Sequence, residues 1–504
     1  MPSGTMSDHS HHAPCCFVIP PYVLNNIVNH PSAPESAKTY ARAALQLTGN
    51  IHQRRNDFIA QRLNATQSTG VVPGIIQNNN TSSSATATTT KRLNRKVYSA
   101  SNTEILDYTL LRSEGDAATS DVAENECYDG FGSTFKFYSD IFDRNSINNA
   151  GITLVGTVHF KNAYSNAQWD GAQMIFGDGD GTFFNRFTAS LDVIGHELTH
   201  GVTQYTANLI YQGQSGALNE SMSDVFGIMV KQYKLNQTSA QSNWLIGPEL
   251  WTSRVNGVAL RSMSSPGTAY NDTVLGKDPQ TATYSEVLST NYPDTYDHGG
   301  VHIYSGVPNR AFYLVATNLG GYSWDRAGRI WWGVLTGGKL RSTANFHDFA
   351  KLTCDQAETL YGASVKEVVE KAWKDVGVEV GKVKTVVGTW AGSHSSSRLE
   401  IAFTLSTGTL KGIGSTTFND KTSIFNIISG SYGPDRSLRF EVKYESPNTS
   451  NESFTGTMYP DGDAISGTWE SVDRAAYVAA GWPDNDILLG SFNVIKTSDF
   501  EMVL

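Results

Sequence analysis

Two histidines stand four positions apart in the stretch VIGHELTHGVTQY, where Glu197 follows His196 and precedes His200. On an α-helix this spacing places both imidazoles on one face, one above the other. Apolar neighbours such as Val193 and Leu198 indicate that at least part of this face is buried. Two interpretations follow. Either the imidazoles bind a metal ion, or they are hydrogen-bonded core residues that share a face by coincidence.

A second polar segment supplies the partners that a metal site would need. A catalytic zinc ion takes three protein ligands and leaves its fourth position for water. In GALNESMSDVFG, Glu220 and Asp224 are four residues apart and therefore share a helix face. Glu220 could complete a site of two histidines and one glutamate, and Asp224 could orient an imidazole from behind. Core packing alone does not explain two helices that both bury polar residues.

Several motifs together resemble the thermolysin-like zinc metallopeptidases, and most closely the protealysin-like subgroup of that family. HELTH and GALNESMSD stand in order with NAQWDGAQMIFGDGDG, LRSMSSP and DHGGVHIYSG over roughly residues 95–380. PPYVLNNI, RNSINNAG and SDVFGIMVKQY are the segments most similar to the subgroup. The resemblance implies a zinc-dependent endopeptidase that acts on peptides or proteins. It also implies an α+β catalytic domain with a β-rich N-terminal lobe and a helical C-terminal lobe.

The resemblance implies a role for each residue near the motif. The residues expected to bind the single zinc ion are His196, His200 and Glu220. Glu197 would take a proton from water and pass it to the leaving amine. Tyr211 and His302 would donate hydrogen bonds to the oxyanion, and Asp297 would fix the tautomer of His302 and raise its pKa. Taken alone, Tyr211 would more often be structural, and the order of the family motifs favours the catalytic role.

Other residues are expected to support the ligands or to hold the substrate. Asn219 and Asp224 would bond the ligands from behind, and Asn219 is not expected to carry a glycan. Arg261 would bind a substrate carbonyl, and Asn166 with Ala167 would receive the peptide as an added strand. The positions that match the family's apolar specificity pocket are Phe184, Phe187, Val193, Ile246, Leu250 and Leu260. They predict cleavage on the amino side of bulky hydrophobic residues, with Phe187 making the pocket shallower.

The pair of calcium ions that thermolysin holds beside its zinc helices is predicted to be absent. Asp192 is the single acid that survives, and Lys231 stands where a glutamate is expected. The remaining matching positions are Asn243, Leu245 and Pro248. Two calcium ions cannot lie against a lysine with one carboxylate left. We expect Lys231 to reach Asp192 instead, the alternative being a solvated surface lysine. Other calcium sites are left open.

Changes in composition along the chain predict separate domains. Residues 1–77 are expected to be a propeptide-like module, and residues 78–94 a low-complexity linker open to proteases. The peptidase would span residues 95–380, with lobes at about 95–206 and 207–380. Helical periodicity predicts long helices at 191–206, 216–234, 301–319, 325–336, 345–360 and 364–376.

The C-terminal part changes character. Residues 385–504 repeat a unit of glycine, threonine or serine, and a bulky residue, and they alternate like strands between turns. This pattern predicts an antiparallel β-sandwich or barrel as an accessory domain. Trp390 and Trp469 are expected in its core, although an exposed aromatic face could bind an unknown ligand.

Composition restricts the partners and the location. A formal net charge of −10 and the lack of a basic stripe argue against a nucleic-acid partner. No apolar run approaches the roughly 18 residues of a membrane span. CCFVIPPYVL is short, contains two prolines and lacks a basic leader, so no Sec signal is predicted. Export by a non-classical route and a cytoplasmic location both stay open, and the resemblance favours export.

The N-terminal module is expected to make the chain a self-processing precursor. Its PPYVL stretch would pack near the cleft until autolysis in the linker releases it. Cys15 or Cys16 could place a thiolate on the zinc, and an idle reduced pair is the simpler alternative. Two other functions compete: an inactive peptidase body that displays the β domain, and a chain whose main activity lies in that domain. The intact Glu197 and His302 favour an active peptidase.

Overall fold

The structure is a computed structural model that describes residues 16–47, residues 91–380 except 291 and 294, and strands between residues 388 and 498. The chain divides into two compact units. Residues 1–287 with 292–377 form the first, and the second consists mainly of residues 378–504.

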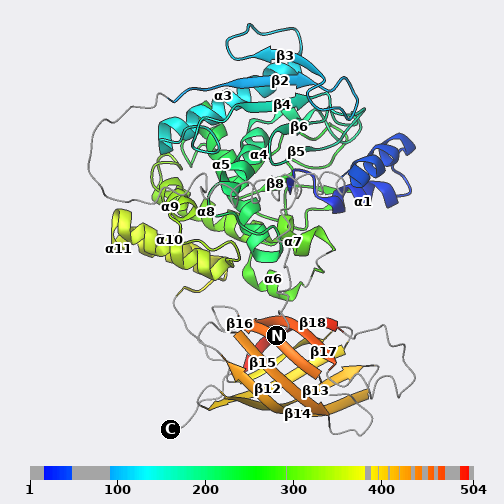
Figure 1. The fold of residues 1–504 in the computed structure, drawn as a ribbon, viewed down its shortest axis with the longest axis vertical. Coiled ribbons are helices and arrows are strands. Elements are labelled where there is room, and N and C mark those ends of the chain that lie inside the picture. The colour runs from blue at the N-terminus through cyan, green and yellow to red at the C-terminus, as the bar shows by residue number, and fades with distance from the viewer. Residues whose placement is uncertain are drawn as a thin grey trace, which may run out of the picture. The chain divides into compact units, whose positions relative to one another are not determined.

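A six-stranded mixed sheet forms the β-rich lobe of the first unit (Figure 1). Its spatial order is β1-β5-β6-β4-β2-β3, with β2 parallel to β4, β4 parallel to β6, and the other neighbours antiparallel. The strands are β1 (Cys16–Phe17), β2 (Arg95–Ser99), β3 (Thr109–Ser113), β4 (Leu154–Val158), β5 (Ala167–Trp169) and β6 (Met174–Phe176). The edge strand β1 comes from the N-terminal module, so this module takes part in the sheet of the catalytic lobe.

The N-terminal module continues from β1 into helices. Pro21 begins α1 (Pro21–Asn29), and proline suits the first helical position because the N–H it lacks would have no partner there. A further helix starts at residue 35 and runs to the end of the described range at residue 47. The PPYVL stretch is therefore the start of a helix.

One long helix of the β-rich lobe was not predicted from the sequence. This helix is α3 (Val122–Phe142). Its N-cap residue is Asp121, whose side chain accepts the Glu124 N–H at 3.1 Å. A Cβ on Gly130 would lie 2.4 Å from Ile194 Cδ1, so this glycine permits close packing against the next helix. Glycines and aromatic residues within α3 obscure its apolar periodicity, so the sequence pattern did not reveal this helix.

Helices dominate the second lobe, as predicted. They are α4 (Leu191–Gln204), α5 (Gly213–Leu235), α6 (Tyr284–Ser289), α7 (Asp297–Tyr304), α8 (Gly306–Leu319), α9 (Ala327–Thr336), α10 (Phe346–Tyr361) and α11 (Ala363–Asp375). The single helix predicted at 301–319 is wrong in one respect, because the helix is divided at Ser305 into α7 and α8. No described helix is long and apolar enough to cross a membrane.

Short elements complete the first unit. A 3₁₀ turn, η1 (Phe187–Ala189), precedes α4, and two small hairpins pair β7 (Leu245–Ile246) with β8 (Arg261–Ser262) and β9 (Asn271–Asp272) with β10 (Gly276–Lys277). These hairpins belong to the segments that connect α5 to α6.

Helices α4 and α5 cross closely in the centre of the first unit (Figure 1). A Cβ on Gly195 would lie 3.1 Å from the Cα of Gly227, and a Cβ on Gly227 would lie 2.4 Å from the carbonyl oxygen of Asp192. Larger residues at either position would push the helices apart. The two glycines therefore let the polar faces of α4 and α5 meet.

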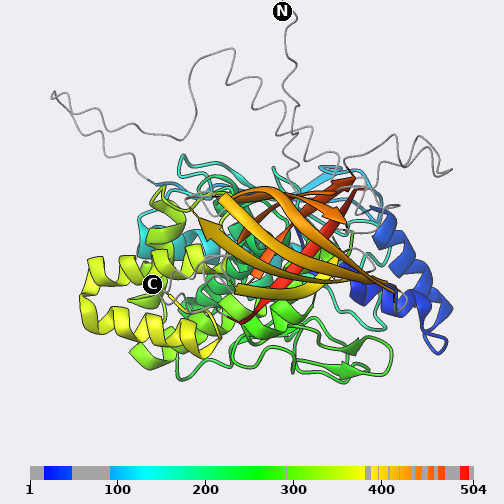
Figure 2. The same ribbon diagram turned by 90° about the horizontal axis from the view of Figure 1, so that it is seen from below.

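The second unit is a closed antiparallel barrel, in which β11 also pairs with β18 (Figure 2). Its strands are β11 (Gly388–His394), β12 (Ser397–Ser406), β13 (Thr409–Phe418), β14 (Lys421–Tyr432), β15 (Ser437–Tyr444), β16 (Glu452–Met458), β17 (Ala464–Ser471) and β18 (Leu489–Ser498). Of the two folds predicted, the barrel is the one observed. Phe440 and Phe454 stack inside it with ring centroids 4.8 Å apart. Trp469 is buried in this core, and the Trp390 side chain lies outside the described part of the structure.

Candidate metal centre

Three buried side chains meet where α4 crosses α5. His196 and His200 lie one turn apart on α4, and their Nε2 atoms are 3.0 Å from each other. The carboxylate oxygens of Glu220 on α5 lie 3.4 Å from His196 Nε2 and 3.5 Å from His200 Nε2. Two ligand atoms held at about 2.0–2.1 Å from one tetrahedral ion would be about 3.3 Å apart. All three separations therefore fit a single ion.

The hydrogen bonds of the two imidazoles indicate that the cluster needs a cation. His196 Nδ1 lies 2.7 Å from Asp224 Oδ1, and His200 Nδ1 lies 2.9 Å from Asn219 Oδ1. With a proton on each Nδ1, two bare Nε2 atoms face a carboxylate. Glu220 Oε2 is buried and has no hydrogen-bond partner among the described residues. A cation would satisfy all three groups, and the donor set of two imidazoles and one carboxylate suits zinc.

Asp224 connects this cluster by hydrogen bonds to Arg261 and Asn309. Its buried carboxylate accepts two hydrogen bonds of 2.8 Å from Arg261 and one of 2.8 Å from Asn309, besides contacting His196. Burial raises the pKa of Asp224, but Arg261 and His196 outweigh it and bring the pKa to about 2. Burial lowers the pKa of His196, but Asp224 and Glu220 raise it to about 9. The site therefore favours positive charge.

Glu197 lies beside the imidazoles and is fully buried. One oxygen of its carboxylate and one nitrogen of each imidazole lie within 4.8 Å of one another. Its Oε2 accepts the backbone N–H of Trp169 on β5 at 2.8 Å, which fixes the carboxylate between the metal cluster and the sheet. A carboxylate held there can accept a proton from water near the cluster.

A left-handed turn sets the position of Asp297. Asp297, His298, Gly299 and Gly300 have φ values of 51°, 50°, 77° and 84°. The two glycines adopt this conformation without a Cβ clash. The turn directs Asp297 toward His302, because Oδ2 accepts the His302 N–H at 3.0 Å and Oδ1 lies 2.5 Å from its Nδ1. The predicted pairing of Asp297 with His302 is therefore present in the structure.

His302 faces acceptors on both ring nitrogens. Asp297 lies at Nδ1, and the carbonyl oxygen of Phe17 lies 2.9 Å from Nε2. Because neither oxygen can donate, both nitrogens must carry a hydrogen, which makes the ring an imidazolium. Burial lowers the pKa of His302, but the Glu220 and Asp297 carboxylates raise it. The Tyr211 hydroxyl donates to Glu220 and lies 3.2 Å from His302 Nε2, so both expected oxyanion donors border the cluster.

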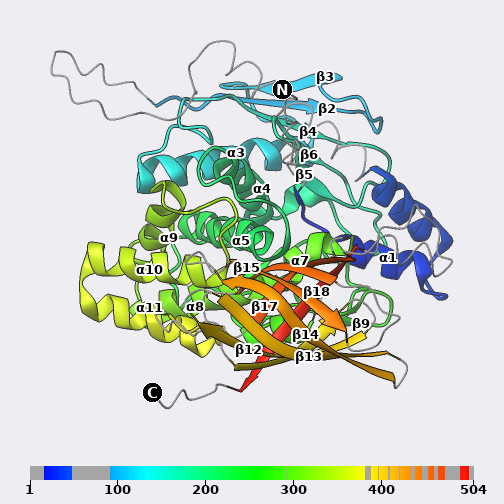
Figure 3. The ribbon, with the colours of Figure 1, turned by 60° about the horizontal axis from the view of Figure 1, so that its bottom comes forward.

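The N-terminal module adds the strand β1 to the sheet beside β5 (Figure 3). Phe17 pairs with Gln168 in antiparallel register, and the Val18 N–H donates to the carbonyl of Ala167 at 3.2 Å. The added strand therefore runs antiparallel to the edge where Ala167 was expected to receive a peptide.

Two side chains hold the same strand by its backbone. Asn166 accepts the Ile19 N–H at 2.9 Å and donates to the Ile19 carbonyl at 3.1 Å. Arg261 donates to the Val18 carbonyl at 3.4 Å. Two of the residues expected to hold a substrate thus hold residues 18 and 19. The PPYVL stretch that follows packs near them, as predicted, because Tyr22 stacks on Tyr296, the neighbour of Asp297. Cys15 and the side chain of Cys16 lie outside the described part of the structure.

The six positions expected to form an apolar pocket are all buried. The rings of Phe184 and Phe187 are stacked with centroids 6.0 Å apart, and the Leu260 N–H donates to the Ile246 carbonyl at 3.0 Å. The Asn185 N–H donates to the Leu250 carbonyl at 2.8 Å, and Val193 lies on α4 before the first ligand. Three chain segments thus supply the six side chains.

Lys231 contacts Asp192 as predicted, with Nζ 2.9 Å from Oδ2, so the alternative of a solvated lysine is wrong. It also lies 3.0 Å from Glu249, which the sequence analysis missed because Pro248 occupies the position where an acid was expected. The Ser190 hydroxyl lies 2.8 Å from Asp192 Oδ1 and 2.5 Å from Glu249 Oε2, and its single hydrogen can be donated to either carboxylate. Burial outweighs the attraction of Lys231 and raises the pKa of Asp192, whereas the two carboxylates raise the pKa of Lys231 against burial.

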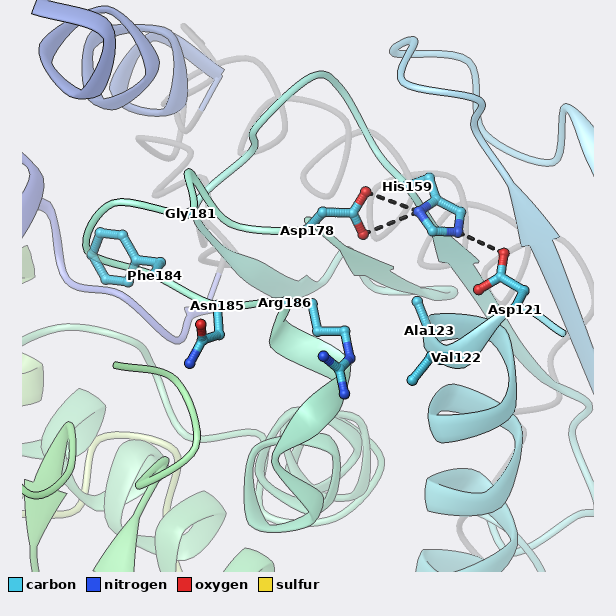
Figure 4. A pocket seen from close by; sticks show the side chains of 9 residues that line it. All are labelled: Asp121, Val122, Ala123, His159, Asp178, Gly181, Phe184, Asn185 and Arg186. Carbon is cyan, nitrogen blue, oxygen red and sulfur yellow. Dashed lines mark hydrogen bonds and ion pairs between the residues drawn. The ribbon is translucent and has the colours of Figure 1, made fainter. Parts of the chain in front are cut away.

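A separate pocket of about 390 Å³ lies beside the start of α3 (Figure 4). In it, His159 Nδ1 lies 2.8 Å from Asp178 and Nε2 lies 2.8 Å from Asp121. The Asp178 hydrogen bond raises the pKa of His159 to about 9, against the effect of burial and with help from Asp121. The residues lining this pocket do not include the histidines of α4, so it is distinct from the metal cluster.

A buried triangle of two imidazoles and a carboxylate, flanked by Glu197 and set between a β-rich and a helical lobe, defines a metal-dependent hydrolase. Comparison with known proteins identifies the family. Residues 63–204 match the thermolysin metallopeptidase catalytic domain, and residues 207–378 match the thermolysin metallopeptidase alpha-helical domain. The chain belongs to the thermolysin family and is a zinc metalloendopeptidase.

Individual relatives agree with this assignment. The chain is 44% identical over 367 residues to an extracellular metalloprotease of Pectobacterium carotovorum, covering 73% of this chain and 97% of the relative. It is 36% identical over 293 residues to a thermolysin of Alicyclobacillus acidocaldarius, covering 56% of this chain and 50% of the relative. The solved precursor of protealysin from Serratia proteamaculans has a TM-score of 0.61 and 42% identity, covering 72% of this chain and 99% of that chain. The protein is therefore a protealysin-like member of the family.

Proposed function

We propose that His196, His200 and Glu220 bind the catalytic zinc of this endopeptidase. The observation that carries the proposal is the set of three ligand-atom separations of 3.0, 3.4 and 3.5 Å in a fully buried cluster. Asp224 and Asn219 hold the two imidazoles from behind so that each Nε2 points toward Glu220, because each accepts from the Nδ1 of its histidine.

Residues around the cluster transfer the proton and stabilise the negative charge that develops in the reaction. When bound, zinc polarises the scissile carbonyl and lowers the pKa of a water molecule. Glu197 accepts the proton of that water and transfers it to the leaving amine, and its bond to the Trp169 N–H fixes it for this role. His302, charged and held by Asp297, donates to the oxyanion together with Tyr211.

Hydrolysis of casein by the activated enzyme tests this assignment. Glu197→Gln is expected to lower the rate about 100- to 10,000-fold, because it removes the general base while keeping the shape of the side chain. Zinc chelation should abolish hydrolysis, and added zinc should restore it. Glu367→Gln on the exposed face of α11 is the matched control. Retention of activity by Glu197→Gln would contradict the role of Glu197, and it would leave an accessory role of the peptidase body as the better reading.

We further propose that Phe184, Phe187, Val193, Ile246, Leu250 and Leu260 form an apolar pocket for the residue after the scissile bond. All six side chains are buried, and none carries a charge that could pair with an acidic substrate. The enzyme is expected to cut before Leu or Phe much faster than before Asp, because an apolar pocket does not offset the desolvation free energy of an unpaired carboxylate. Matched peptides that differ at this one position measure the ratio, and equal rates would exclude the pocket.

The precursor is proposed to be latent because its N-terminal module fills the cleft. The contacts of Asn166 and Arg261 with residues 18 and 19 support this, since the same groups would hold a substrate. The domain limits proposed are residues 1–77, 78–94, 95–380 and 385–504. The barrel is proposed as an accessory domain with an unidentified ligand, and the site of action as extracellular, which the name of the Pectobacterium relative supports.

The calcium pair of thermolysin is proposed to be replaced by the contacts of Lys231. Its ammonium group occupies the space between Asp192 and Glu249, at 2.9 and 3.0 Å. A cation already fixed between the two carboxylates would repel calcium.

A further inference from the structure

The strand in the cleft has the direction and the register of a substrate. At Cys16 and Phe17 it pairs with β5 in antiparallel register, and the backbone of Val18 and Ile19 meets the groups proposed to hold a substrate. Along the strand, His302 contacts the carbonyl of residue 17, Ala167 the N–H of residue 18, and Asn166 the backbone of residue 19. The backbone therefore passes the catalytic groups in one consistent order.

The contact of His302 identifies the bond at the reaction centre. Its Nε2 lies 2.9 Å from the Phe17 carbonyl oxygen, 3.2 Å from the Tyr211 hydroxyl and 3.5 Å from Glu220. The carbonyl that faces the oxyanion donors is the one that is attacked. Resting on the proposed function of this site, we infer that Phe17–Val18 is held as a scissile bond and that the precursor cuts itself there.

The reaction is an ordinary hydrolysis. The oxygen of a water molecule bonds to the Phe17 carbonyl carbon, and Glu197 takes a proton from that water. The bond between this carbon and the Val18 nitrogen breaks, and the proton passes to the nitrogen. The products are a carboxylate at Phe17 and an amine at Val18. Val18 is apolar and follows the bond, in keeping with the proposed preference for hydrophobic residues at that position.

Most contacts of the module lie after this bond and survive the cut. They include the hydrogen bonds of Val18 and Ile19, the stacking of Tyr22 on Tyr296 at 6.3 Å, and the bond from Asn26 to the Leu275 carbonyl at 2.7 Å. Residues before the bond contribute the pairing of β1 with β5 and the contact of His302 with Phe17. The chain that begins at Val18 therefore keeps the cleft occupied, and release requires a second cut further along.

N-terminal sequencing and intact mass of the full chain with zinc test the inference. A species that begins at Val18 is expected to form at a first-order rate that tenfold dilution does not change, because the bond is cut within its own cleft. Glu197→Gln should not form it. Val18→Asp should slow it by at least about tenfold, since it places a charge in an apolar pocket. Val122→Asp, at an exposed position on α3, is the control that should leave the rate unchanged.

Amide hydrogen exchange gives a readout that does not depend on activity. The amide of Ile19, which donates to Asn166, should stay protected in the nicked chain as in the uncut Glu197→Gln chain. Loss of that protection after the cut would overturn the continued occupation of the cleft. A first new terminus elsewhere, with Phe17–Val18 intact, would overturn the inference while casein hydrolysis by the same sample upholds the proposed function. If no new terminus forms and casein is not hydrolysed either, both fail.

Discussion

Single buried residues in this protein serve more than one partner. Asp224 accepts from His196, Arg261 and Asn309, so one carboxylate orients a proposed zinc ligand and a group that holds the bound strand. Because its pKa is about 2, its carboxylate stays ionised at neutral and at mildly acidic pH. Loss of Asp224 would therefore disturb both metal affinity and peptide binding, which argues that the two properties are coupled in the fold.

The sequence could predict residues whose chemistry requires a fixed spacing. His196, His200 and Glu220 were found because helical spacing and ligand type restrict them strongly. Glu249 and Asn309 could not be found in this way. They reach Lys231 and Asp224 from distant segments, and neither residue type nor local spacing shows that contact in advance.

Replacement of Lys231 tests the proposed substitute for calcium at the residue scale. Lys231→Met is expected to lower the free energy of unfolding by about 3–5 kcal/mol, because it leaves the buried Asp192 without its cation. Lys231→Glu should make the melting temperature rise with added calcium, since three carboxylates then face one another. Thermal unfolding with and without calcium measures both, with the exposed Lys234→Glu as control. Equal calcium effects in wild type and Lys231→Glu would contradict the replacement.

At the scale of elements, side-chain periodicity predicted where helices exist better than it predicted the residues at which they begin and end. Five of the six helices predicted from Leu191 onward are single helices, and each buries an apolar face. The division between α7 and α8 was missed, since apolar residues continue on both sides of Ser305 and Ser305 itself keeps helical backbone angles. The strand β1 was missed for a different reason. It exists only because β5 offers an edge, which no local pattern reveals.

His159 joins two elements by charge, because it bonds Asp121 at the start of α3 and Asp178 in the glycine-rich turn after β6. Its pKa is raised from 6.5 to about 9, so the stability it contributes is fully present below pH 6.5 and is lost as the pH rises through 9. His159→Gln should therefore lower the melting temperature most at pH 6.5.

The difference between wild type and His159→Gln should nearly vanish at pH 10. Thermal unfolding at a series of pH values measures it, with Asp121, Asp178 and the nearby Arg186 unchanged in both proteins. His30→Gln, in the turn after α1, is the control. A difference that stays constant from pH 6.5 to pH 10 would show that the charge of His159 does not hold the two elements together.

At the scale of the whole molecule, the chain combines two units with separate cores. The barrel closes on itself through β11 and β18, so it has no unpaired edge that needs another part of the chain. Its interior is filled by side chains such as Phe403, Phe425 and Leu438. Both family matches end by residue 378, before the barrel begins. The composition change after the peptidase was enough to predict a separate β domain, but alternation alone could not distinguish a barrel from a sandwich.

Independent cores predict independent folding. A chain that ends at residue 384 is expected to fold and to hydrolyse casein at a rate within about twofold of the full chain, because a domain with its own core folds alone. Residues 385–504 expressed separately should unfold in one cooperative transition, and calorimetry of the full chain should show that transition beside one from the peptidase. If neither part folds without the other, the two cores depend on each other. A truncated chain that folds but loses hydrolysis would instead assign the barrel a part in catalysis.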